Sequence, residues 1–179
     1  MKTMKRIAVL LAALFFVAGA ALSAQAPQPA EDLDATYATD LLKKGTKAPA
    51  FTLRDVDGKT YTLKDFRGKT FVIDFWATWC PDCRAETEAL VALKKANPDV
   101  VFLGISFDTE KEKLAAYTRE HGMDWLQLSE FKKWKETDVS AAYHIKWIPT
   151  QYVIDPKGRV VFGTVMLEKV EAWLRNRKR

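Results

Sequence analysis

The sequence predicts an α/β fold with a central mixed β-sheet and helices on both of its faces. Two continuous apolar runs, at residues 70–76 and 100–106, predict buried strands, and a segment with helical spacing follows each run. Pairs of alternating segments near both ends of the chain predict β-hairpins. The resulting order of hairpin, strand, helix, strand, helix, hairpin and helix brings strands of both directions into one sheet.

The first predicted hairpin joins residues 51–54 to residues 59–63, where apolar and polar side chains alternate. Asp57 and Gly58 lie between the two segments and form the dipeptide that tight hairpin turns prefer. Residues 64–69 then form a turn that leads into the buried strand at 70–76.

A helix over residues 85–95 follows that strand, and Pro81 suits its first turn, where no amide donor is required. The connecting segment is Ala77-Thr78-Trp79-Cys80-Pro81-Asp82-Cys83. Cys80 is therefore predicted at the N-terminus of the helix. Unpaired amides and the helix dipole favour a thiolate at this position, and the thiolate is the attacking form of cysteine.

Cys80 and Cys83 are the only cysteines among the 179 residues. A zinc ribbon needs a second pair of ligands, and a small disulfide-stapled fold needs several bridges. One Cys-x-x-Cys between a buried strand and a helix instead predicts a dithiol that cycles between reduced and oxidised forms. A static disulfide in a binding module remains the non-enzymatic alternative.

The second half of the chain repeats the alternation of strands and helices. A helix over residues 110–121 is expected to turn Leu114, Ala115 and Tyr117 inward. The remaining predicted elements are an extended piece at 125–128, a helix at 136–143, strands at 150–155 and 159–162 around the turn at 156–158, and an amphipathic helix at 167–175.

The N-terminus has the three parts of a secretory signal. Lys2, Lys5 and Arg6 precede the apolar stretch at 7–22, and residues 24–26 offer a small-x-small cleavage site. We expect a signal peptide at 1–26, a linker at 27–44 with at most a short helix at 38–43, and one domain at 45–179. The protein would then be exported to the periplasm or cell envelope, with membrane contact only if residues 1–26 are retained as an anchor.

The charge of the chain gives little support to nucleic-acid binding. The formal charge of +5 includes the three cations of the predicted signal peptide. Without them 25 basic residues face 23 acidic ones, so the expected mature chain is nearly neutral. His121 and His144 have no ligand spacing, and we expect no metal and no organic cofactor.

The motif Trp79-Cys80-Pro81-Asp82-Cys83 and the downstream Ile148-Pro149-Thr150 together resemble the thioredoxin superfamily. The similarity is greatest to its exported TlpA/ResA-like thiol-disulfide oxidoreductases, a redoxin or AhpC/TSA-like group. Residues 45–53 and the hairpin that follows them resemble an added N-terminal hairpin of that group. The resemblance implies a thioredoxin-like fold over residues 45–179.

The resemblance also implies roles for single residues. Cys80 would be an exposed nucleophile, Cys83 a buried resolving thiol, and Pro149 a cis-proline that faces them. The residues expected to contact a substrate are Trp79, Pro81, Ile148 and Thr150.

Asp74 departs from many TlpA/ResA-like relatives, which have a neutral residue at this position. It lies six residues before Cys80 in an otherwise apolar strand and matches the buried acid of thioredoxin. Burial raises the pKa of a carboxyl group, which suits Asp74 to exchange protons with Cys83. An aspartate that points to water at the end of the strand is the structural alternative.

These observations predict an exported enzyme that reduces protein disulfides through the Cys80–Cys83 dithiol and is recharged by a membrane electron donor. Its substrate, for example an apocytochrome c during cytochrome c maturation, is left open. A thiol peroxidase of the peroxiredoxin type is the enzymatic alternative, because the early hairpin, Thr78 and Cys80 resemble that family. Cys83 argues against it, since it completes a Cys-x-x-Cys motif.

Overall fold

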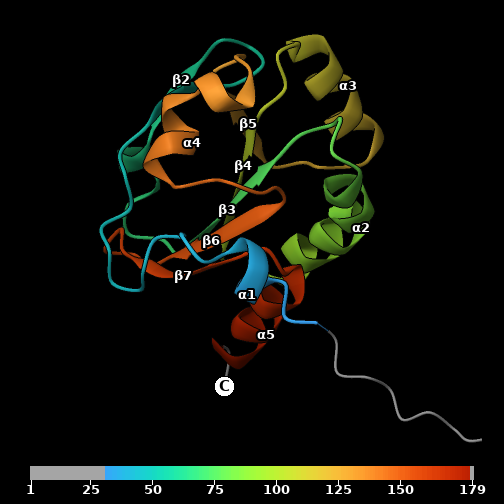
Figure 1. Cartoon of the computed structure of the whole chain (residues 1–179). Coiled ribbons are helices and arrows are strands. Elements are labelled where there is room, and N and C mark those ends of the chain that lie inside the picture. The colour runs from blue at the N-terminus through green and yellow to red at the C-terminus, as the bar shows by residue number, and fades with distance from the viewer. Residues whose placement is uncertain (1–30, 178–179) are drawn as a thin grey trace, which may run out of the picture. The chain divides into compact units, whose positions relative to one another are not determined.

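The computed structural model describes residues 31–177, and these contain one seven-stranded sheet (Figure 1). Its strand order is β2-β1-β5-β4-β3-β6-β7. The strands are β1 (Thr52–Arg54), β2 (Thr60–Thr62), β3 (Phe71–Trp76), β4 (Val101–Ser106), β5 (Leu126–Ser129), β6 (Thr150–Ile154) and β7 (Val160–Thr164). Central strand β3 pairs parallel to β4 and antiparallel to β6, so the sheet is mixed, as predicted.

Helices cover both faces of the sheet. On one face, the Thr87 hydroxyl of α2 (Pro81–Ala96) hydrogen-bonds to Tyr117 of α3 (Lys111–Glu120) at 3.0 Å. Helix α5 (Leu167–Arg177) contacts α2 on that face (Figure 1). On the other face, Tyr143 follows α4 (Asp138–Ala142) and packs against Phe75, with ring centroids 5.2 Å apart. Neighbouring strand residues point to opposite faces, so Trp76 instead meets the Tyr117 ring.

All six residues of β3 are buried, which explains why this segment is a continuous apolar run. Asp74 is the one acid in it. Its side chain lies on the face of the sheet that α2 covers. Its neighbours across the strands are Gln151 of the antiparallel strand β6 and Gly104 of the parallel strand β4. The sheet thus places an acid and an amide side by side under the helix that carries the cysteines.

The predicted helix at 136–143 is interrupted. A 3-10 turn, η2 (Trp134–Glu136), ends at Thr137, and α4 begins only after it. Thr137 has an extended backbone and its hydroxyl accepts the Ser140 amide at 3.4 Å, which is the arrangement of an N-cap. The predicted turn at 64–69 likewise contains a 3-10 helix, η1 (Leu63–Phe66), which a capping box of Thr62 and Asp65 begins.

The folded unit begins at Asp32, earlier than the expected boundary at residue 45. The linker expected at 27–44 is therefore wrong for residues 32–44, and a helix forms at α1 (Asp34–Tyr37) instead of 38–43. Asp34 accepts hydrogen bonds from the Thr164 hydroxyl and the Val165 amide, both at 2.8 Å. These partners are about 130 positions away in sequence, so local patterns could not indicate them.

The predicted signal peptide, residues 1–26, lies outside the described residues. Within residues 31–177, no helix has the length and hydropathy that crossing a bilayer requires.

Candidate active site

Cys80 caps the N-terminus of α2, at the strand-to-helix junction that the sequence predicted. Its backbone is extended and Pro81 occupies the first turn, where a missing amide hydrogen costs nothing. The Cys80 sulfur accepts the Cys83 amide at 3.2 Å and donates to the Ile148 carbonyl at 3.6 Å. The nucleophile candidate is thus held between a helix end and the loop that precedes β6.

Both cysteines are free thiols, and both are buried, at 4% exposed for Cys80 and 5% for Cys83. The expectation that Cys80 is exposed is therefore wrong. Its sulfur turns inward to the Cys83 amide and the Ile148 carbonyl instead of outward to solvent. The neighbouring Trp79 is the exposed residue of the motif, at 53%.

The two thiols have opposite acidities. The hydrogen bond from the Cys83 side chain is the largest effect that lowers the pKa of Cys80, to about 7, while the charge of Asp82 opposes it. The same hydrogen bond raises the pKa of Cys83 well above its ordinary value, and burial and the nearby Asp74 raise it further. At neutral pH Cys80 is therefore the thiol that ionises, and Cys83 stays protonated.

The Ile148–Pro149 peptide bond is cis, which confirms this part of the expectation. Ile148 presents its carbonyl to Cys80. Thr150 is fully buried, and its hydroxyl donates to the Trp147 carbonyl at 2.7 Å. Its side chain therefore supports the loop from inside, whereas Pro81 is exposed beside the motif.

Asp74 lies in the interior, 4% exposed, and does not point to water. Burial raises its pKa to about 7, against the smaller opposing effect of a hydrogen bond from Gln151 Nε2 to Asp74 Oδ1 at 3.0 Å. A group that titrates near neutral pH can take and return a proton during turnover.

Glu86 and Gln151 are residues of the site that the sequence reasoning missed. Gln151 Nε2 also contacts Glu86 Oε2 at 3.3 Å, and burial followed by the charge of Asp74 raises the pKa of Glu86 to about 8. Glu86 follows Cys83 by three positions, so the helical period alone places both on one face of α2. Gln151 gave no such signal, because its position depends on the pairing of β6 with β3.

A polar network holds the loop before Cys80 in place. The buried Asp108 accepts the Thr78 amide at 3.0 Å and the Thr78 hydroxyl at 2.6 Å. The Ser106 hydroxyl also donates to Asp108, at 2.7 Å. Residues 77–79 are therefore tied to the end of β4.

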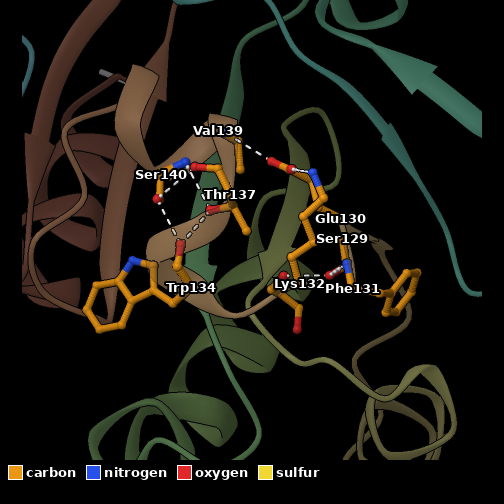
Figure 2. A network of polar contacts seen from close by, with 9 residues as sticks. Ser129, Glu130, Phe131, Lys132, Trp134, Thr137, Val139 and Ser140 are labelled. Atoms are coloured by element: carbon orange, nitrogen blue, oxygen red, sulfur yellow. Dashed lines mark hydrogen bonds and ion pairs between the residues drawn. The ribbon is translucent and has the colours of Figure 1, made fainter.

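A second network shapes the segment between β5 and α4, seen from close by in Figure 2. The Trp134 carbonyl accepts the hydroxyls of Thr137 at 2.8 Å and Ser140 at 3.0 Å. The Trp134 ring stacks on Phe107, with centroids 5.4 Å apart, and contacts Trp79 at 6.4 Å. An aromatic cluster of Phe107, Trp134 and Trp79 thus connects the interior to the exposed rim of the site.

None of the groups of His, Cys, Asp and Glu within residues 31–177 is arranged to hold a metal ion. The site combines three features: a Cys-x-x-Cys motif at a helix N-terminus, a cis-proline loop against its first sulfur, and a buried acid in the neighbouring strand. Together they define a thioredoxin-fold thiol-disulfide oxidoreductase.

Comparison with known proteins agrees with this class. A model of the AhpC/TSA family matches residues 44–162. The thioredoxin-like protein YneN of Bacillus subtilis is 29% identical over 73% of this chain and 78% of its own length. The thiol-disulfide oxidoreductase ResA of the same organism is 27% identical over 67% of this chain and 66% of its own length.

A solved structure, the thioredoxin domain of a thiol-disulfide oxidoreductase from Bacteroides vulgatus, is also similar. It is 29% identical, with a TM-score of 0.68, over 75% of this chain and 97% of that one. The chain belongs to the AhpC/TSA family. The names of these relatives do not favour the peroxidase alternative.

Proposed function

We propose that the protein is exported and reduces disulfide bonds of other proteins in the periplasm or cell envelope. The observation that carries this proposal is the difference in acidity between two thiols that contact each other. The pKa of Cys80 is lowered to about 7, while that of Cys83 is raised. A reductase needs one thiolate to attack and one protonated thiol held in reserve, and a static bridge needs neither.

In the first step the Cys80 thiolate attacks one sulfur of the substrate disulfide. A Cys80–substrate disulfide forms, and the other substrate sulfur leaves as a thiolate and takes a proton from solvent. In the second step Cys83 loses its proton and attacks the Cys80 sulfur. The Cys80–Cys83 disulfide forms, and the second substrate sulfur leaves as a thiol once protonated. The substrate gains two electrons and two protons.

Asp74 is the proposed acceptor of the Cys83 proton. Its charge raises the pKa of Cys83, which places the two groups within electrostatic reach. Its own pKa of about 7 lets it hold that proton at neutral pH and release it later.

A protein substrate would bind across the exposed Trp79 and the Ile148 loop. Trp79 offers a large apolar surface directly beside the nucleophile. The Ile148 carbonyl points at Cys80, so an extended substrate segment could donate a backbone amide to it as the thiol contact is released. Pro81, which follows Cys80 directly, adds exposed surface to the motif.

Export is supported by the charged, apolar and small-residue segments within residues 1–26. Each turnover leaves an oxidised Cys80–Cys83 pair that must be reduced by another dithiol. Outside the cytosol those two electrons have to come from across the membrane, which supports a membrane protein as the donor. No organic cofactor or metal takes part in the proposed steps.

The choice between disulfide and peroxide as oxidant tests the proposal. The fully reduced protein is mixed separately with insulin and with hydrogen peroxide at pH 7, and Cys80–Cys83 oxidation is followed by rapid quench with an alkylating reagent. We expect insulin to oxidise the pair in a bimolecular reaction that also yields reduced insulin chains. Faster oxidation by equimolar peroxide, with insulin reduced at the uncatalysed rate, would favour a peroxidase instead.

A further inference from the structure

Beneath the cysteines, two carboxyl groups from different elements meet at one amide nitrogen. Asp74 comes from β3, Glu86 from α2, and Gln151 from β6. Gln151 Nε2 lies 3.0 Å from Asp74 Oδ1 and 3.3 Å from Glu86 Oε2. The two carboxyl oxygens are therefore no farther apart than the sum of those distances.

The side-chain amide of Gln151 is completely buried, and only its nitrogen end is hydrogen-bonded. Its two Nε2 hydrogens serve the two carboxyl groups, whereas Oε1 is buried with no hydrogen-bond partner among the described residues. Unpaired buried acceptors are costly and rare. The Gln151 side chain thus leaves its oxygen unpaired while its nitrogen holds both acids.

The surroundings contain negative or neutral groups but no paired cation. The titratable groups that affect Glu86 electrostatically are Asp74, Cys80 and Glu168 of α5. Asp74 faces Cys83. None of the ion pairs found within residues 31–177 includes Asp74 or Glu86. Two ionised carboxylates on one amide would therefore repel each other in a poorly solvated site.

We propose that Gln151 joins Asp74 and Glu86 into one acid pair that holds a single proton while the dithiol is reduced, with that proton on Glu86 and Asp74 left free to accept the Cys83 proton. The use of Asp74 in turnover rests on the function proposed above, but the acid pair itself does not. Gln151 is a positioning residue in this arrangement, because it acts through the two acids.

The hydrogen bonds support this distribution of the proton, because Gln151 Nε2 lies nearer to Asp74 Oδ1, at 3.0 Å, than to Glu86 Oε2, at 3.3 Å, and so favours the ionised form of Asp74. The pKa of Asp74 is raised to about 7 and that of Glu86 to about 8, so the pair loses its first proton mainly from Asp74. Interacting groups of this kind titrate in two separate steps that belong to the pair. Glu86 is also partly exposed, whereas Asp74 is buried, so the pair has its contact with solvent on the Glu86 side.

Carboxyl titrations of the reduced protein test the pair without any measurement of activity. The Asp and Glu side-chain carboxyl carbons are followed by NMR from pH 4 to 10 in the wild type, Asp74→Asn and Gln151→Leu. Gln127→Leu is the matched control, since Gln127 is also a buried glutamine but its Oε1 accepts the Trp76 indole.

In Asp74→Asn, Glu86 should titrate at least about one pH unit lower than in the wild type, because the neighbouring charge is gone. In Gln151→Leu, Asp74 should titrate about one unit or more higher, because its ionised form loses a hydrogen bond. Gln127→Leu should leave both titrations in place. Equal Glu86 titrations in the wild type and Asp74→Asn would overturn the pair, even if Gln151→Leu does not fold.

If the two titrations are coupled but the protein does not reduce insulin, the acid pair is supported and the proposed function is contradicted. If the protein reduces insulin but the two acids titrate independently, the acid pair is contradicted and the proposed function is supported.

Discussion

Replacement of Cys83 by alanine is expected to turn the protein into a trap for its substrates. The Cys80 thiolate, with its pKa lowered by the Cys83 side chain and amide, still has the amide as a hydrogen-bond donor in this variant. It can attack, but no second thiol can displace the product, so the mixed disulfide should accumulate to nearly one equivalent. Cys80→Ser should reduce insulin only at the uncatalysed rate, because a serine hydroxyl is not ionised at neutral pH.

Mass spectrometry of quenched reactions measures the trapped species directly. A second readout is the rate of alkylation of each cysteine in the reduced wild type at pH 7. Cys80 should react first, since the pKa of Cys83 is raised by the hydrogen bond with Cys80 and by burial. Faster alkylation of Cys83, or a stable mixed disulfide on Cys83 in Cys80→Ser, would reverse the assignment of the two roles.

Asp74→Asn is expected to make the reduced protein more stable at pH 8 and slower to resolve the mixed disulfide. The pKa of Asp74 is about 7 in the folded protein and 3.8 as the ordinary value. Between these values the folded state binds a proton that the unfolded state has released. Stability therefore falls as pH rises from about 4 to about 7 and stays low above it.

Asparagine has no charge to bury, so the stability of the variant does not fall in this way as the pH rises. We expect it to match the wild type near pH 4 and to be more stable by about 2–4 kcal/mol at pH 8, at about 1.4 kcal/mol per pKa unit. Urea unfolding at both pH values measures the difference. Glu88→Gln is the control, because Glu88 is an exposed acid of α2, the helix that packs over Asp74, and it should change stability by less than about 0.5 kcal/mol.

The same substitution removes the proposed proton acceptor. The first attack by Cys80 should be little affected, while resolution by Cys83 should be slower at pH 7 and recover at high pH, where Cys83 ionises unaided. A stability gain that is equal at pH 4 and pH 8, or an unchanged pH profile for resolution, would contradict a buried ionisable Asp74.

Local patterns were sufficient for the elements that define the class of protein. The apolar run before Cys80 and the proline after it predicted the strand-to-helix junction, because both act within a few residues. Asp74 stood out for the same reason, as one acid in a buried strand. The cis bond before Pro149 came from the resemblance and not from the local sequence.

Most of the features that the sequence analysis missed depend on partners far along the chain. Gln151 reaches Asp74 only because β6 pairs with β3, and residues 32–44 fold onto the domain through contacts such as that of Asp34 with Val165. Cys80 is buried because the Ile148 loop lies against it, which no spacing within the motif could reveal. Glu86 is the exception, since its helical spacing from Cys83 was readable.

The midpoint potential of the Cys80–Cys83 couple at pH 7 tests the central claim most directly. Thioredoxin, with a nucleophile pKa of about 7, has a potential near −270 mV, and the oxidant DsbA, with about 3.5, has one near −120 mV. Because the pKa of Cys80 is about 7, we expect a value closer to the thioredoxin end. Asp82→Asn should raise the potential, since the charge of Asp82 opposes the thiolate, while Glu88→Gln should not. A wild-type value near −120 mV would contradict a reductase and indicate an oxidase.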